Sequence, residues 1–215
     1  MKNLKPISKI FLGILIVLCI LYTVGLLNFA DGLKSTRYII LAKDDSLNTM
    51  IPCNFDKFLN NEKTPKLAIE LYNNKAKLSE EPLSYFGNLK STDFQKRAFY
   101  FRVITNSYKG ADGSYSEGLA NFGKEFIENN TENFVSYFDK KQCFNDYDLY
   151  IWADIVISEF LIIREVEYDK LIINDYTKKL KTNCKSCSKT QQNTIDKFEK
   201  IIKRKWSDYL NKTEK

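Results

Sequence analysis

The chain has 215 residues, with 33 basic and 27 acidic side chains and a formal net charge of +6. It contains no histidine, so the commonest general base, proton shuttle and metal ligand are missing, which argues against most enzyme classes. Glycine and proline are scarce, which favours helices over a turn-rich β architecture. We therefore expect an all-α fold, with one domain behind an N-terminal segment and no cofactor.

The first thirty residues have the pattern of a membrane anchor. Residues 10–30 carry no charged side chain and are rich in Ile, Leu and Val. At about 1.5 Å per helical residue, this segment spans a hydrocarbon core of roughly 30 Å. Lys2, Lys5 and Lys9 precede it, so the positive-inside rule predicts a cytoplasmic N-terminus and a domain on the other side of the membrane.

Two other interpretations of this segment fit less well. A cleaved signal peptide ending at Ala30 would place Asn28 where a small residue is required, and its apolar run would be too long. A lipoprotein signal at Cys19 would have Leu18 where a small residue is expected. The predicted organisation is a cytoplasmic tail (1–9), a transmembrane signal-anchor helix (10–30), a linker (31–45) and an extracytoplasmic all-helical domain (46–215).

Three helix starts are predicted in the first half of the domain. They are a Thr-Pro pair at 64–65, a Thr-x-x-Gln capping box at 92–95, and a Ser-x-x-Glu capping box at 114–117 after the turn at 110–113. Pro82 is expected to break the chain between the first two helices. The expected inward side chains are Leu67, Leu71, Tyr72 and Leu78, then Phe94, Ala98, Phe101 and Ile104, then Tyr115, Leu119, Phe122 and Phe126, then Phe134, Val135 and Phe138.

Three helices are predicted in the second half. Residues 146–163 are apolar on nearly every side, which indicates a central buried helix. Two more helices are expected over 168–180 and 191–210, with a Ser-x-x-Gln box at 188–191 capping the last one. Its inward side chains should be Ile195, Phe198, Ile201, Ile202, Trp206 and Tyr209. Short loops between these helices predict a helical bundle or a short stack of helical hairpins.

The cysteines suggest disulfides. Cys184 and Cys187 lie in a polar Cys-x-x-Cys loop before a helix, and outside the cytoplasm we expect them to form a local disulfide. Cys53 and Cys143 would then form a second one. A redox role is the alternative, because nearby lysines and a helix N-terminus lower a thiol pKa, and free thiols are a third option.

Two carboxylates interrupt the predicted central helix. We expect Asp154 or Glu159 to meet Arg97, Arg102 or Arg164 in a partly buried ion pair. The alternative is a catalytic carboxylate with a raised pKa, as in glycoside hydrolysis, although five residues of separation place the two on different helix faces.

Charge is distributed unevenly along the domain. Residues 31–169 hold 17 basic and 22 acidic side chains, whereas residues 170–215 hold 13 and 5. Lys197, Lys200 and Arg204 form a stripe on the last helix, which is either a solvated face or a surface for an anionic lipid or acidic protein. We expect the asymmetry to be complementary within the fold rather than a partner surface.

These features favour a single-pass protein of a bacterial cell membrane, with a non-catalytic protein-binding domain in the periplasm. The sequence has no glycine-rich phosphate loop, no nucleophile beside a base, no metal-ligand cluster and no nucleic-acid patch. An immunity protein or inhibitor that meets a toxin or hydrolase suits such a domain. The alternatives are a scaffold or assembly subunit of an envelope complex, and a thiol-disulfide factor using Cys184 and Cys187.

Overall fold

The computed structural model describes residues 54–75, 81–139, 144–163 and 171–213, all within one compact unit, Asn48–Lys215. Over these residues the regular secondary structure is helical, so the all-α prediction is confirmed. The elements are α2 (Asp56–Leu59), α3 (Lys66–Tyr72), the 3-10 helix η1 (Glu81–Lys90), α4 (Phe94–Ser107), the 3-10 turn η2 (Tyr108–Gly110), α5 (Gly113–Asn129), α6 (Thr131–Ser136), α7 (Asp146–Ile162), α8 (Leu171–Asn183) and α9 (Lys189–Thr213).

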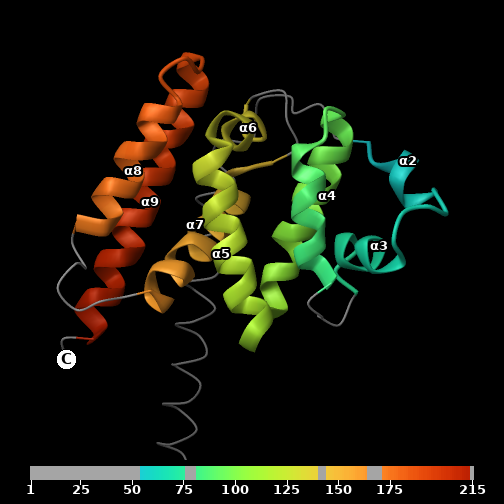
Figure 1. The fold of residues 1–215 in the computed structure, drawn as a ribbon, viewed down its shortest axis with the longest axis horizontal. Helices are drawn as coiled ribbons and strands as arrows, with labels where there is room; N and C mark the ends of the chain where they lie inside the picture. The colour runs from blue at the N-terminus through green and yellow to red at the C-terminus, as the bar shows by residue number, and fades with distance from the viewer. Residues whose placement is uncertain (1–53, 76–80, 140–143, 164–170, 214–215) are drawn as a thin grey trace, which may run out of the picture. The chain divides into compact units, whose positions relative to one another are not determined.

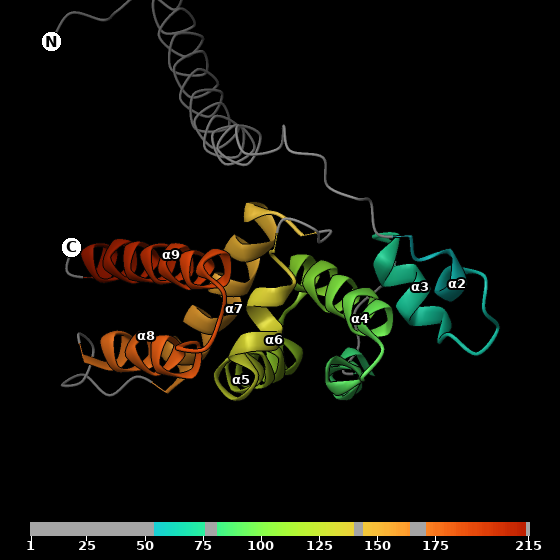
Figure 2. The ribbon, with the colours of Figure 1, turned by 90° about the horizontal axis from the view of Figure 1, so that it is seen from above.

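The helices are arranged around α7, consistent with a bundle. α7 packs against α5, α9 and α4, while η1 packs against α4 and α5, and α3 packs against α4. Figures 1 and 2 both show α8 and α9 side by side as a hairpin, next to the part of the unit that contains α5 and α7. The predicted anchor at 10–30 lies outside the described residues, and among those described no helix is long and apolar enough to cross a membrane.

Trp152 of α7 lies at the centre of the core, which confirms the prediction of a central buried helix. Its side chain is fully buried, and the Phe101 ring of α4 stacks on it with 4.5 Å between ring centroids. The indole Nε1–H donates to Thr105 Oγ1 at 2.9 Å, so the one polar atom of this side chain is satisfied. Further rings, those of Phe126 and Phe134, pack edge-on or tilted around the indole.

Gly123 of α5 allows the closest approach between α5 and α7. A Cβ at this position would lie 2.4 Å from Ile155 Cγ2, well inside normal van der Waals contact. The sequence pattern predicts Phe122 as an inward residue, but Phe122 is 43% exposed and the buried position is taken by Gly123. The inward stripe of α5 is otherwise confirmed, because Tyr115, Leu119 and Phe126 are buried.

α4 begins later than predicted. Asp93 Oδ1 accepts hydrogen bonds from the backbone N–H groups of Gln95 at 2.8 Å and Lys96 at 3.2 Å, so the N-cap is Asp93 and not Thr92. A carboxylate caps well because its full charge also interacts with the positive end of the helix dipole.

Two other predicted boundaries also differ. Pro82 was expected in a break between two helices, but it is the buried second residue of η1. A proline is tolerated there because the first N–H groups of a helix have no acceptor within the helix. α5 begins at Gly113, whose φ of +46° suits glycine, with Asp112 as N-cap, two residues before Ser114, the N-cap of the predicted box. The last helix starts as expected, because Ser188 N donates to Gln191 Oε1 at 3.0 Å and Gln191 N to Ser188 Oγ at 3.3 Å.

We expect Gly123→Ala to destabilise the protein by about 1–3 kcal/mol, because the new methyl group overpacks a contact with a fully buried side chain of α7. This loss outweighs the roughly 1 kcal/mol that alanine gains over glycine in helix propensity. Urea unfolding followed by circular dichroism measures the free energy of unfolding of the variant and of the unaltered protein. Gly118→Ala, in the same helix, is the matched control, since its nearest neighbour is the half-buried and flexible Leu83. Equal free energies of unfolding for Gly123→Ala and Gly118→Ala would contradict the close approach of α5 to α7 at Gly123.

Candidate functional site

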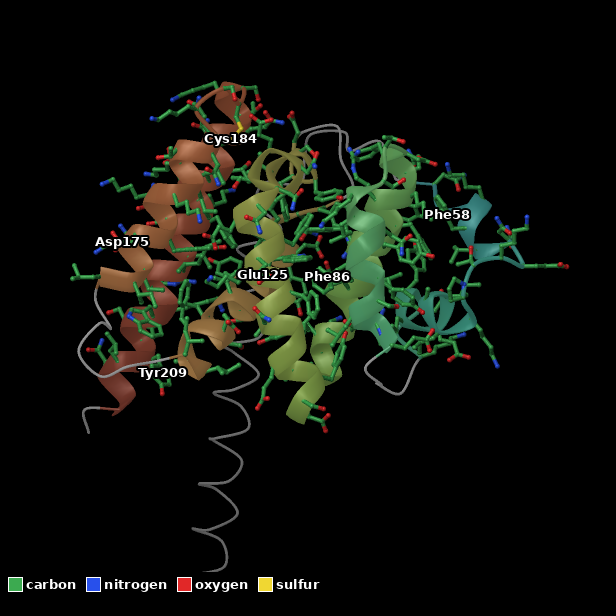
Figure 3. The ribbon with its side chains drawn as sticks, in the orientation of Figure 1. Phe58, Phe86, Glu125, Asp175, Cys184 and Tyr209 are labelled. Atoms are coloured by element: carbon green, nitrogen blue, oxygen red, sulfur yellow. A yellow bond between two sulfur atoms is a disulfide. The ribbon has the colours of Figure 1, made fainter. Side chains whose placement is uncertain are left out.

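The disulfide predicted at the Cys-x-x-Cys loop is present. Cys184 and Cys187 are bonded, with a Cα–Cα distance of 5.0 Å, at the tip of the α8–α9 hairpin (Figure 3). Cys184 is 2% exposed and Cys187 is half-buried. Cys53 and Cys143, the second predicted pair, lie outside the described residues.

Hydrogen bonds hold this loop against its neighbours. Ser186 Oγ donates to Glu132 Oε1 of α6 at 2.6 Å, and Gln192 Nε2 of α9 donates to the Cys187 carbonyl at 3.1 Å. The disulfide therefore joins the ends of two helices in a fixed loop. Cys187 directly precedes the N-cap of α9, a position that would favour its thiolate, so the redox alternative stays a prediction.

The basic stripe of the last helix packs partly onto α7. Lys197 Nζ lies 2.7 Å from Asp146 Oδ2, and Arg204 Nη2 donates to the Tyr150 hydroxyl at 3.0 Å. Lys200, the third residue of the stripe, is exposed. Two of the three candidate partner-binding residues thus have partners within the domain.

Asp154 and Arg102, two members of the expected ion pair, each have a different partner, and Arg164 lies outside the described residues. Asp154 pairs with Lys205 of α9 at 2.6 Å, a residue that sequence reasoning missed. Arg102 of α4 pairs instead with Asp148, through Nη1 to Oδ1 at 2.5 Å and Nη2 to Oδ2 at 3.0 Å. Asp148 is the better position because it lies in the first turn of α7, where Oδ2 also accepts the Asn145 N–H in a capping box.

Glu159 is the second buried carboxylate of this helix, after Asp148. Among the described residues it makes no hydrogen bond or ion pair, and burial raises its pKa. Lys124 of α5 opposes this shift, while Glu125 adds to it. The raised pKa matches what the catalytic alternative needs, but no cavity among the described pockets includes Glu159.

A surface pocket lies beside the Arg102–Asp148 pair. Its volume is about 370 Å³, and its walls come from the end of α3, from α4 with η2, and from the start of α7. We call it the Tyr147 pocket; it is lined by Tyr72, Asn74, Arg102, Asn106, Lys109, Asn145, Tyr147, Asp148 and Ile151. Sequence reasoning picked out only Arg102 of these, because the others converge from segments far apart in the chain.

Two asparagines build the α3 wall of the Tyr147 pocket. Asn74 has a φ of +56° and ends α3 in a Schellman motif, in which Asn74 N donates to Leu71 O and Lys75 N to Glu70 O. Asn106 of α4 donates from Nδ2 to the carbonyl of Tyr72 at 2.9 Å, which satisfies another helix-end carbonyl. This wall is therefore held by hydrogen bonds made without any ligand.

The opposite wall carries the accessible functional groups. Tyr147 is 39% exposed in the first turn of α7, and Lys109 Nζ lies 6.0 Å from the centroid of its ring. Asp148, in contrast, is 2% exposed at the side chain and is neutralised by Arg102. The pocket thus offers a phenol, amides and an ammonium group, a set suited to binding a polar group.

No family model matches this chain, and comparisons with curated proteins and with solved structures give no significant match.

We expect Arg102→Met to lower the free energy of unfolding by about 3 kcal/mol, because it leaves the Asp148 carboxylate buried without its counter-ion. The control is Lys57→Met, which breaks the Lys57–Asp93 pair, where the side chains are 52% and 49% exposed. That change should cost less than about 1 kcal/mol. Chemical unfolding of both variants at neutral pH checks this, and similar losses would mean that the Arg102–Asp148 pair contributes no more than a surface pair.

We expect Glu159→Gln to stabilise the protein at pH 7 and to leave it unchanged near pH 4. The folded-state pKa of Glu159 is raised above 4.5, so its favourable contribution exists below the unfolded pKa and is lost as the pH rises through the folded pKa. Thermal unfolding across this pH range measures the difference. Glu117→Gln, on the exposed face of α5, should change stability at neither pH, and a pH-independent effect of Glu159→Gln would refute the assignment.

Proposed function

We propose that this chain is a non-catalytic protein-binding domain that recognises its partner through the Tyr147 pocket. The observation that carries the proposal is the lining of this pocket. Tyrosine and arginine are enriched at the residues that dominate binding energy in protein interfaces, and asparagine supplies adaptable hydrogen bonds. Tyr147 and Lys109 are accessible on its rim, while its walls are held by internal hydrogen bonds, so little ordering would be needed on binding.

The proposed location is the outer side of a bacterial cytoplasmic membrane, with residues 10–30 as the anchor. Two features support it. The uncharged segment follows three lysines, as the positive-inside rule requires for this orientation. The Cys184–Cys187 disulfide is of the kind that persists in oxidising compartments such as the periplasm.

Within this class we favour an immunity protein or inhibitor that binds a secreted toxin or hydrolase. A small pocket with pre-formed walls suits the capture of one protruding group of a partner. A scaffold subunit of an envelope complex is the alternative, and the identity of the partner decides between them.

Site-specific photo-crosslinking tests the proposal. The full-length protein would carry p-benzoylphenylalanine at Tyr147 or, as the matched control, at Phe122, an aromatic residue of similar exposure on α5. After irradiation of native membranes, mass spectrometry identifies the crosslinked proteins. We expect one specific partner from position 147 and none from 122. The proposal fails if the two positions give the same products or if position 147 gives none.

A further inference from the structure

Among the described residues that line the Tyr147 pocket, one cation has no ion-pair partner. Arg102 and Asp148 neutralise each other, and Asp146, on the same first turn of α7, is paired with Lys197. Lys109 is exposed and makes no ion pair with any described residue. Over the described lining, the accessible charge is therefore the Lys109 ammonium group, which lies near the face of the Tyr147 ring.

We propose that the Tyr147 pocket binds a carboxylate of the partner, an aspartate or glutamate side chain on a loop or tail, with Lys109 as its counter-ion. This rests on the proposed protein-binding function. Charge complementarity is the first argument, because the surplus charge at the rim is positive. Size is the second, because 370 Å³ lies at the low end of ligand pockets and suits one or two side chains rather than a whole helix.

The rest of the lining fits the same ligand. The hydroxyl groups of Tyr72 and Tyr147 and the Asn145 amide can donate hydrogen bonds to carboxylate oxygens. Ile151 adds an apolar surface, which excludes water and strengthens the ion pair relative to one in open solvent. The buried Asp148 does not repel the ligand strongly, because Arg102 holds both of its oxygens.

A peptide titration tests this with a defined probe. The full-length protein in neutral detergent, with its lysines ¹³C-dimethylated so that they keep their charge, would be titrated with acetyl-Gly-Glu-Gly-amide and with the Gln analogue. The ¹³C NMR signal of Lys109 is the one that is missing from the spectrum of Lys109→Arg. We expect the Glu peptide to shift this signal and the Gln peptide to bind about fivefold more weakly. Equal binding of the two peptides, no shift, or equally tight binding of inorganic phosphate would overturn the carboxylate assignment.

Charge reversal tests it on the natural partner. Lys109→Glu should reduce the crosslink from position 147 by about tenfold, whereas Lys109→Arg should retain it. Lys90→Glu, at an exposed site at the end of η1, is the control and should have no effect. If the crosslink is unchanged in Lys109→Glu, the proposal that Lys109 binds a carboxylate of the partner is refuted, whereas the protein-binding function is still supported. If the unaltered protein gives no crosslink, that function fails, and the titration still decides what the pocket binds.

Discussion

The structure depends on the burial of α7 on almost every side. A helix in this position has only a narrow, partly exposed face, so a polar side chain on one of its buried faces needs a partner from a neighbouring helix to offset desolvation. The partners come from two sides: α4 satisfies Asp148 and the Trp152 indole, and α9 satisfies Asp154. These contacts fix the rotation and register of α7 in a way that its uniformly apolar surface does not. Glu159 has no such partner among the described residues, and its burial without one disfavours the ionised carboxylate.

The same constraint produces the Tyr147 pocket. Asp148 is the N3 residue of the capping box that begins α7, and its burial requires the arginine of α4. This pair holds the start of α7 beside α4, next to the end of α3, and the space between the three elements is the pocket. Tyr147, one residue before Asp148, lies about 100° away around the helix axis and is 39% exposed. The groups proposed to bind a partner are thus positioned by interactions that stabilise the fold.

Features that depend on local sequence could be predicted, and those that depend on distant pairing could not. The central helix, the Cys184–Cys187 disulfide and the cap of α9 each rest on residues close together in the chain. The Arg102–Asp148 pair joins residues 46 positions apart, and helical spacing holds no information about it. Phe122 was misplaced for a related reason: α5 turns Gly123 toward α7, where a Cβ would lie 2.4 Å from Ile155 Cγ2, and this leaves Phe122 43% exposed. The Tyr147 pocket combines three such distant segments and has no local signal at all.

The uneven charge of the domain is explained in part by packing between its two halves. Basic side chains of the α8–α9 hairpin pair with carboxylates of α5 and α7, in Lys179–Glu128, Lys197–Asp146 and Lys205–Asp154. An excess of lysine in the last helix is therefore weak evidence for an anionic partner, because much of that charge is already neutralised inside the domain. The more informative cation is Lys109, which belongs to the acidic half of the sequence and has no ion-pair partner among the described residues. Recognition is better inferred from a charge that the fold leaves uncompensated than from a charge excess along the chain.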